Sequence, residues 1–371
     1  MKISRRFYQT VHSVKNEETT LLMGSDILGN LHQLPDINSP EYSSFLLFAD
    51  KNVFDIYGRK LVSSLKKTGK KVFVSLFDHG EKDKNLISVT KMIKPFISAG
   101  IDRKACLISF GGGVASDIGG FIASILLRGI SSINLPTSLL AQTDAAIGGK
   151  SGVDLWLPDG TMAKNMIGSF RQPREVITDI DTLSTLPRKE LLNGLGEMAK
   201  YAIGWDIPAK NQLQKLAKGN FTDKSLLMEI VFSCQKLKAE IIRKDPLDIL
   251  GEREKLNFGH TVGHGVEGAS KGRLSHGEAV SIGIAAAAKV SLLLGLLDNK
   301  DYLFLIDFLK KLNLPVRING LVEGDILKLI GLDKKAGRFV LIKNPFRKNC
   351  LVIKDSVEKK LLEKALEYIL I

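Results

Sequence analysis

The sequence contains no hydrophobic run long enough to cross a lipid bilayer. A membrane-spanning helix needs about 20 consecutive apolar residues. The nearest candidate, Ala279–Leu297, includes Lys289 and several small residues, and it therefore predicts a buried helix. The basic N-terminal segment lacks the apolar core of about 7–15 residues that secretory signals carry. We therefore expect neither a signal peptide nor a membrane partner.

Cysteine is scarce as well. The chain has 3 cysteines, Cys106, Cys234 and Cys350, and none lies in a CxxC pair. Scattered cysteines in odd number exclude a disulfide scaffold and a cysteine zinc ribbon. They favour a reducing compartment, so we expect a cytoplasmic protein.

Aromatic residues make up only 7% of the chain, which is poor for stacking on nucleic-acid bases. The formal net charge is +13, but the basic residues are spread along the sequence. Such a balance is compatible with nucleic acid or with small anionic ligands. We expect a small anionic substrate and no nucleic acid; a basic nucleic-acid-binding protein is kept as an alternative.

The chain has 371 residues, of which 44% are apolar and 25% charged, so two globular domains or one large domain are expected. In the first half, strand-like segments alternate with helical ones, which predicts a parallel sheet. The strands are expected at 45–50, 70–77, 106–110, 130–136 and 175–180, and the helices at 85–99, 119–127 and 138–145.

The second half changes to long helical patterns. They are expected at 189–202, 224–243, 260–269, 277–296, 300–311 and 357–370. We place the domain boundary near Leu186–Pro187. The predicted fold is an α/β nucleotide-binding domain over residues 1–186, followed by a mostly α-helical metal- and substrate-binding domain over residues 187–371.

The segment CLISFGGGVASD joins an apolar strand to a helix through three glycines. Glycines let a backbone approach a phosphate closely, and a helix N-terminus offers unpaired N–H groups and a positive dipole end. The spacing is not that of the G-x-G-x-x-G fingerprint. The segment therefore predicts either a pyrophosphate-binding loop or an ordinary tight turn.

Three of the 6 histidines lie close together in the sequence, at His260, His264 and His276. His260 and His264 are four residues apart and share one helix face. Imidazoles of this kind bind Zn²⁺, which needs three protein ligands in a catalytic site. The segment HTVGH lacks the glutamate of the H-E-x-x-H metalloprotease motif. Satisfied structural histidines are the alternative.

Charged residues also stand alone among small or apolar neighbours, where an unpaired charge is costly. A pair in the second half, Glu197 and Lys200, lies three residues apart on one helix face. The pattern indicates either an ordinary ion pair or a cleft lined with charges. Outside that pair, the isolated residues are Arg128, Asp144, Lys150, Lys164 and Asn165.

Taken together, these segments resemble the 3-dehydroquinate synthase family, one of the sugar phosphate cyclases. The resemblance extends from about Gly80 to Lys335 and rests on many motifs in the same order. They are HGEKDK, GGGVASD, PTSLLAQTDAAIGGKSG, KNMIGSFRQP, TLSTLPRKE, GLGEMAKY, GEREKLNFGHTVGH and SHGEAV.

The resemblance implies a divalent metal, Zn²⁺ or Co²⁺, held by Glu197, His260 and His276, with His264 facing the substrate. It implies NAD contacts at Gly80, Glu81, Lys84, Gly113, Val114, Asp117, Thr137, Ser138, Asp144, Lys150, Lys164, Thr182 and Thr185. It implies catalytic and substrate contacts at Arg128, Asp144, Lys150, Asn165, Lys200, Lys238, Arg253, Asn257, His264, and Lys334 or Lys335.

The implied reaction belongs to the shikimate pathway of aromatic amino-acid biosynthesis. It converts 3-deoxy-D-arabino-heptulosonate 7-phosphate into 3-dehydroquinate and phosphate. NAD⁺ would oxidise a ring carbinol and later return the hydride, and the metal would polarise the carbinol oxygen. We expect a homodimer. We also expect Arg253 to bind the substrate carboxylate, with Arg253, Asn257 and His260 on one face of a continuous segment.

The chain departs from the family pattern at several positions. Ala145 and Ala146 stand where serines are usual, Ser138 stands for threonine and Ser116 for glycine. His79 and Asp154 also differ, and the loop 153–163 is longer. These departures keep alternatives open: a cyclase making an amino-dehydroquinate or valiolone-type product, or an NAD-dependent polyol dehydrogenase of related fold.

Overall fold

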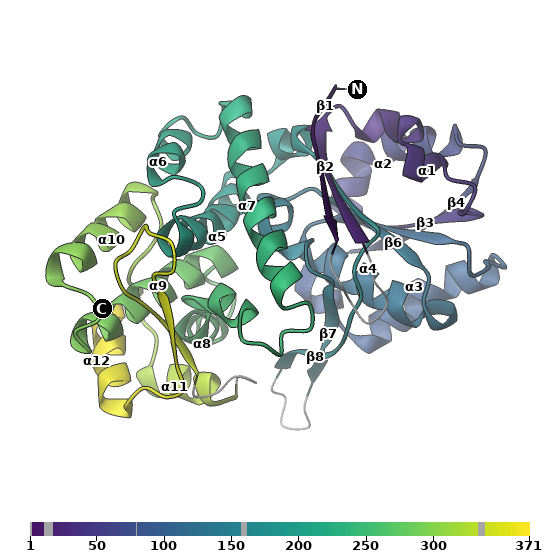
Figure 1. Cartoon of the computed structure of the whole chain (residues 1–371). Coiled ribbons are helices and arrows are strands. Elements are labelled where there is room, and N and C mark those ends of the chain that lie inside the picture. The colour runs from purple at the N-terminus through teal and green to yellow at the C-terminus, as the bar shows by residue number, and fades with distance from the viewer. Residues whose placement is uncertain (1, 11–17, 79, 157–161, 333–337) are drawn as a thin grey trace. The chain divides into compact units, whose positions relative to one another are not determined.

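The computed structural model describes all of the chain except residues 1, 11–17, 79, 157–161 and 333–337. The chain forms two compact units, which are described separately (Figure 1). Unit 1 comprises residues 1–186 and 238–247, and unit 2 comprises residues 187–237 and 248–371. Helix α7 (Lys224–Lys244) therefore begins in unit 2 and ends in unit 1. The division of cofactor and metal binding between residues 1–186 and 187–371 stays a prediction.

Unit 1 is built on a seven-stranded sheet with the strand order β1-β2-β9-β6-β5-β3-β4. Six strands are parallel, and β1 pairs antiparallel with β2 at one edge. The strands span Lys2–Thr10 (β1), Glu18–Ser25 (β2), Ser44–Asp50 (β3), Lys71–Phe77 (β4), Cys106–Gly111 (β5), Ser131–Pro136 (β6) and Glu175–Asp179 (β9). The predicted parallel α/β fold is confirmed, with β1 and β2 added.

Both faces of this sheet are covered by apolar side chains, which explains the continuous apolar runs of its strands. In β3, Phe45 and Leu47 belong to the apolar layer that includes Leu61 and Leu65 of helix α2 (Lys51–Lys66). Phe48 points to the opposite layer, formed with helices α3 (Leu86–Ser98) and α4 (Gly113–Ile125). Figure 1 shows α2 on one side of the sheet and α3 and α4 on the other.

Two parts of unit 1 differ from the predicted elements. Helix α4 begins at Gly113, directly after the glycine-rich turn, rather than at Gly119. The expected helix at 138–145 is a short helical turn that ends as a π-helical segment, Ala141–Ala145. A separate antiparallel hairpin follows, formed by β7 (Lys150–Trp156) and β8 (Met162–Phe170).

Unit 2 is mostly helical, as predicted. Its helices besides the first part of α7 are α5 (Arg188–Trp205), α6 (Lys210–Lys218), α8 (His260–Ser270), α9 (His276–Leu293), α10 (Asn299–Lys311), α11 (Glu323–Leu332) and α12 (Lys359–Ile369). A small hairpin joins β10 (Phe339–Ile342) to β11 (Leu351–Lys354). Within the described residues, no helix combines the length and the apolar character that crossing a membrane requires.

Glycines allow the central helices of unit 2 to touch through their backbones. A Cβ atom on Gly283 of α9 would overlap the carbonyl oxygen of Gly259, directly before α8. A Cβ on Gly196 of α5 would overlap the backbone of Gly277 in α9. Because real side chains cannot occupy this space, α5, α8 and α9 pack closely only with glycine at these positions.

We expect Gly283→Ala to lower the free energy of unfolding by about 1–3 kcal/mol, because an extra methyl in a filled interior forces the backbones apart. Chemical denaturation would measure the change. Gly324→Ala is the matched control, since nothing lies within 4 Å of a Cβ at that position of α11. It should not lower the free energy of unfolding. An equal loss in both variants would contradict the packing argument.

Candidate functional site

Three side chains from three helices of unit 2 converge on one point. Glu197 lies in α5, His260 is the first residue of α8, and His276 is the first residue of α9. The Nε2 atoms of both histidines lie 3.2 Å from the Glu197 Oε1 atom. One carboxylate and two imidazoles within 4.8 Å of one another form a candidate metal centre.

The other ring nitrogen of each histidine is held by the protein. The Nδ1 atom of His276 lies 3.1 Å from the Glu267 Oε2 atom, and that of His260 lies 3.2 Å from the Phe258 carbonyl oxygen. Such contacts fix each imidazole ring and turn its Nε2 atom toward the Glu197 carboxylate, where a bound metal ion would take the place of a proton. Carboxylate and imidazole are the donors of catalytic zinc sites. The residues present therefore fit a divalent metal.

The cluster holds a charged carboxylate away from solvent, because Glu197 is completely buried. Burial alone would raise its pKa, but the Lys200 ammonium and the contacts with His260 and His276 hold the pKa well below its ordinary value. Burial lowers the pKa of His260 to about 4. Burial also disfavours the charged form of His276, yet Glu197 and Glu267 raise its pKa to about 10. The carboxylate is thus kept ionised and ready to bind a cation.

Local backbone structure explains the positions of the two histidines. Gly259 has φ +79° and turns the chain directly before His260. Before His276, Ser275 and Glu278 form a capping box at the start of α9. The amide of Gly277 donates to the Asn193 side chain of α5, over 2.7 Å. These contacts set where α8 and α9 begin relative to Glu197.

Of the other predicted substrate residues of unit 2, Lys200 and His264 lie beside the metal-ligand cluster, whereas Arg253 and Asn257 belong to a separate short helix. Lys200 is buried and paired with Glu197, and the His264 ring centroid lies 5.2 Å from that of His260. The expectation that Arg253, Asn257 and His260 lie on one face of a continuous segment is wrong. Arg253–Asn257 is a short 3-10 helix, and an extended residue and the turn at Gly259 separate it from α8.

In unit 1, the glycine-rich loop joins β5 to α4 as expected. Gly111 has φ +152°, in a region that L side chains rarely adopt, and a Cβ there would lie 2.8 Å from the Ala115 Cβ atom. The Asp117 carboxylate on α4 accepts from the Lys84 ammonium over 2.7 Å. Ser138 lies against the loop, because a Cβ on Gly112 would be 3.4 Å from its Oγ atom. The helix start carries the free N–H groups that anions bind.

Further predicted residues of unit 1 are held by contacts with other side chains. The Lys238 ammonium, from the end of α7, contacts both the Asp144 carboxylate at 3.0 Å and the Asp144 carbonyl oxygen at 2.8 Å. The Lys164 ammonium lies 3.8 Å from the Glu81 carboxylate. Thr182 is buried and accepts from the Gln142 side chain.

The remaining predicted positions fall into three groups. Gly113 and Val114 begin α4, Gly80 begins a short 3-10 turn, and Thr137 donates its amide to the Gly111 carbonyl oxygen. Arg128, Lys150, Asn165 and Thr185 are exposed. Lys334, Lys335 and the departure at His79 lie outside the described residues.

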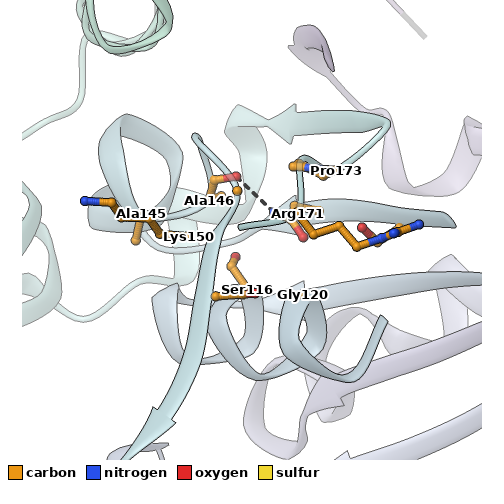
Figure 2. Close-up of a pocket in the computed structure, with 11 residues that line it drawn as sticks. Ser116, Gly120, Ala145, Ala146, Lys150, Arg171 and Pro173 are labelled. Carbon is orange, nitrogen blue, oxygen red and sulfur yellow. Dashed lines mark hydrogen bonds between the residues drawn. The ribbon is translucent and has the colours of Figure 1, made fainter. Parts of the chain in front are cut away.

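A small polar pocket in unit 1 brings two of the sequence departures together. Figure 2 shows Ser116 and Gly120 of α4 facing Ala145 and Ala146 across it. The Asn134 side chain also lines the pocket and donates to the Ala146 carbonyl oxygen over 2.9 Å. The hydroxyl gained at Ser116 therefore lies opposite the two hydroxyls that the alanines lack.

Glu267 belongs to the candidate site through its contact with His276, and the sequence motifs did not predict it. It lies on α8, three residues after His264 and seven after His260, so it shares their helix face. That spacing could have identified it. The role of Asn193 could not have been found in this way, because its contact with Gly277 depends on how α5 packs on α9.

The fold and the metal-ligand cluster define the class. The chain has the fold of the sugar phosphate cyclases. It is similar to 2-deoxy-scyllo-inosose synthase complexed with carbaglucose-6-phosphate, NAD⁺ and Co²⁺, with a TM-score of 0.84 and 23% identity over 98% of this chain and 100% of that one. It is also similar to the 2-epi-5-epi-valiolone synthase of Streptomyces hygroscopicus subsp. jinggangensis with NAD⁺ and Zn²⁺ bound. That TM-score is 0.83, at 24% identity over 97% of this chain and 98% of that one.

Within this class, sequence similarity identifies the family. Residues 74–193 match the 3-dehydroquinate synthase N-terminal family, and residues 194–336 match the 3-dehydroquinate synthase C-terminal family. The 3-dehydroquinate synthase of Thermodesulfovibrio yellowstonii is 39% identical over 319 residues, which cover 84% of each chain. The chain belongs to the 3-dehydroquinate synthase family, as its motifs predicted, and is an enzyme of the phosphate-eliminating cyclase class.

Proposed function

We propose that this enzyme converts 3-deoxy-D-arabino-heptulosonate 7-phosphate into 3-dehydroquinate and phosphate, with NAD⁺ and a divalent metal ion, Zn²⁺ or Co²⁺. The similarity to 3-dehydroquinate synthases over most of the chain supports the reaction. The observation that carries the proposal is the convergence of Glu197, His260 and His276 through their ligand atoms. A buried carboxylate with two oriented imidazoles is the ligand set of a catalytic zinc site.

Bound NAD⁺ supplies a hydride acceptor that is restored within the same turnover, and the bound metal ion supplies a Lewis acid for a carbinol oxygen. The protein's own part is to bind and orient. Glu197, His260 and His276 hold the metal, while Glu267 and the Phe258 carbonyl oxygen fix the histidine rings. The start of α4 presents N–H groups for the nucleotide phosphates.

We assign binding of the anionic substrate groups to cationic and polar side chains, because a phosphate and a carboxylate need charge-assisted donors. Lys200, Lys238 and Arg253 are all buried, and each is therefore held in one place. The assigned contacts are Arg128, Asp144, Lys150, Asn165, Lys200, Lys238, Arg253, Asn257 and His264. The assigned nucleotide contacts are Gly80, Glu81, Lys84, Gly113, Val114, Asp117, Thr137, Ser138, Asp144, Lys150, Lys164, Thr182 and Thr185.

We expect purified enzyme with NAD⁺ and metal to release one phosphate per heptulosonate phosphate consumed, without build-up of NADH. The physical reason is that the hydride returns to the substrate before the product leaves. Phosphate release and NADH absorbance, followed in the same reaction, measure both quantities. Stoichiometric NADH would instead indicate a dehydrogenase.

A sugar phosphate without a carboxylate tests the remaining alternative in the same assay. Faster cyclisation of sedoheptulose 7-phosphate than of the heptulosonate would indicate a valiolone-type cyclase. We further propose that the enzyme is a cytoplasmic homodimer. The three cysteines support the compartment, because all of them are buried and their number and spacing do not suit a disulfide scaffold. Sedimentation analysis would test the dimer.

A further inference from the structure

The hairpin of unit 1 contains a bulge at the residues that we assign to the nucleotide and the substrate. Val153 pairs with Ile167, and Leu155 pairs with Ala163. A single residue of β7, Asp154, therefore faces three residues of β8, Lys164–Met166. Bulges interrupt the ladder of backbone hydrogen bonds and redirect side chains, and they are frequent beside active sites.

Asp154 compensates for the interrupted ladder. Its Oδ1 atom accepts the backbone N–H of Asn165 over 2.7 Å. Asn165 has φ +54°, in the left-handed region that asparagine tolerates better than most residues. The side chain of Asp154 thus takes the place of the strand partner that the bulge removes, at a residue with an uncommon backbone conformation.

Asp154 also ties the hairpin to the segment before α3. Its backbone N–H donates to the Lys84 carbonyl oxygen over 2.7 Å, and its backbone bridges that of Asn85. The same Lys84 side chain pairs with Asp117 on α4. One residue therefore connects the bulge with the Lys84 segment, which carries assigned nucleotide contacts.

The burial of Asp154 excludes an ordinary surface role. The residue is 3% exposed, and its Oδ2 atom has no hydrogen-bond partner among the described residues. Burial raises the pKa of this carboxyl group, while the Asn165 amide and Lys84 lower it. A buried carboxyl group with an unpartnered oxygen is costly, so a particular task must offset the cost.

We propose that Asp154 is a positioning residue that fixes the backbone of the β8 bulge. Because this backbone is also bonded to the Lys84 segment, Lys164 and Asn165 are held in defined positions. The proposal rests on the proposed function, since the roles of Lys164 and Asn165 belong to it. Asp154 itself need not touch substrate. It acts through the backbone of Asn165, and the hydrogen-bond acceptor at Oδ1, rather than the negative charge, performs this task.

The test compares Asp154→Ala with Asp154→Asn, because an asparagine keeps an oxygen that can accept from the Asn165 amide. We expect Asp154→Ala to lower kcat/KM about 10- to 100-fold, since small misplacements of binding groups have effects of this size. Its dissociation constant for NAD⁺ should rise at least about 3-fold, because Lys164 loses its fixed position. Asp154→Asn should stay within about 3-fold of the wild type in both quantities.

Hydrogen exchange of the Asn165 amide gives a readout that does not depend on the reaction. It should quicken at least about 10-fold in Asp154→Ala and little in Asp154→Asn, because only alanine removes the acceptor. Ser169→Ala is the matched control: it removes the 3.1 Å Ser151–Ser169 contact on the same hairpin and should leave exchange and activity unchanged.

Unchanged exchange at Asn165 in Asp154→Ala would overturn the proposal, as would equal damage in Asp154→Asn, which would point to the charge. A wild-type enzyme that releases no phosphate from the heptulosonate would refute the proposed function instead. The exchange result would still decide the role of Asp154 in that case.

Discussion

Alanine at position 276 is expected to abolish phosphate release and to weaken metal binding by more than 100-fold. The His276 ring supplies one of three ligand atoms around the Glu197 carboxylate, at 3.2 Å from its Oε1 atom. Loss of a residue that only orients a ligand already costs about 10- to 100-fold in metal affinity. Loss of the ligand itself must cost more. Metal analysis after dialysis and titration with Co²⁺ would measure the affinity.

His276 is a better target than Glu197 for this experiment. Glu197 pairs with the buried Lys200, so its replacement would leave a buried cation without its counter-charge and destabilise the fold. His276 begins α9 and is partly exposed, so His276→Ala should lower the free energy of unfolding less than replacement of Glu197, although it removes the ring that contacts Glu197 and Glu267. His32→Ala serves as a control, because His32 contacts Ser64 in unit 1 and is remote in sequence from the cluster.

A variant of Glu267 distinguishes the loss of a metal ligand from the loss of the contact that orients the His276 ring. Glu267→Gln keeps a side-chain oxygen near His276 but removes the charge that orients the ring. Metal affinity should fall by about 10- to 100-fold, less than in His276→Ala. Full metal occupancy in His276→Ala after dialysis would refute the assigned metal centre. Equal affinities in wild type and Glu267→Gln would refute only the orienting role.

The second large effect is expected at Arg253. Its side chain is 3% exposed, and the two flanking carboxylates are engaged by other cations. The Glu254 carboxylate accepts from Arg338 over 2.6 Å, and that of Glu252 pairs with Lys255 at 3.1 Å. A guanidinium group offers a planar fork that matches a carboxylate, which lysine cannot reproduce.

We therefore expect Arg253→Lys and Arg253→Ala to lower kcat/KM for the heptulosonate phosphate by about 30- to 1000-fold, equivalent to about 2–4 kcal/mol. Turnover of sedoheptulose 7-phosphate, which lacks the carboxylate, should change much less. Arg317→Ala is the control, because that exposed guanidinium stacks on the Tyr368 ring. Should Arg253→Ala slow both sugars equally, the carboxylate role would be wrong.

The elements that the sequence predicts well are those with a strong local pattern. The apolar runs of β3, β5, β6 and β9 and the long helices α5, α7, α8 and α9 lie within a few residues of their expected bounds. Elements whose existence depends on distant partners were missed. Among the described strands, the edge strand β1 pairs only with β2, and β7 and β8 pair with each other. Periodicity within one segment carries no information about such pairing.

For the candidate site too, the sequence predicted which residues take part better than it predicted how they are arranged. Motif order alone identified Glu197, His260 and His276 as a group through a family resemblance, but the residues themselves left the role of His264 open. The prediction of a continuous segment placed Arg253 and Asn257 on the same face as His260. Phe258 and Gly259 interrupt that segment, and Gly259 does so with a backbone angle that glycine adopts freely.

By itself, the sequence determined which chemical groups are available and which segments form strands or helices, because side-chain identity and apolar periodicity are local properties. Only the tertiary structure decided where those groups meet. Backbone contacts at Gly196, Gly277 and Gly283 bring the ends of α8 and α9 against Glu197. The contact of Glu267 with His276 and the bond from the Asn165 amide to Asp154 arise in the same way. Each depends on distances of a few ångströms between residues of separate elements, which packing sets and chain order does not.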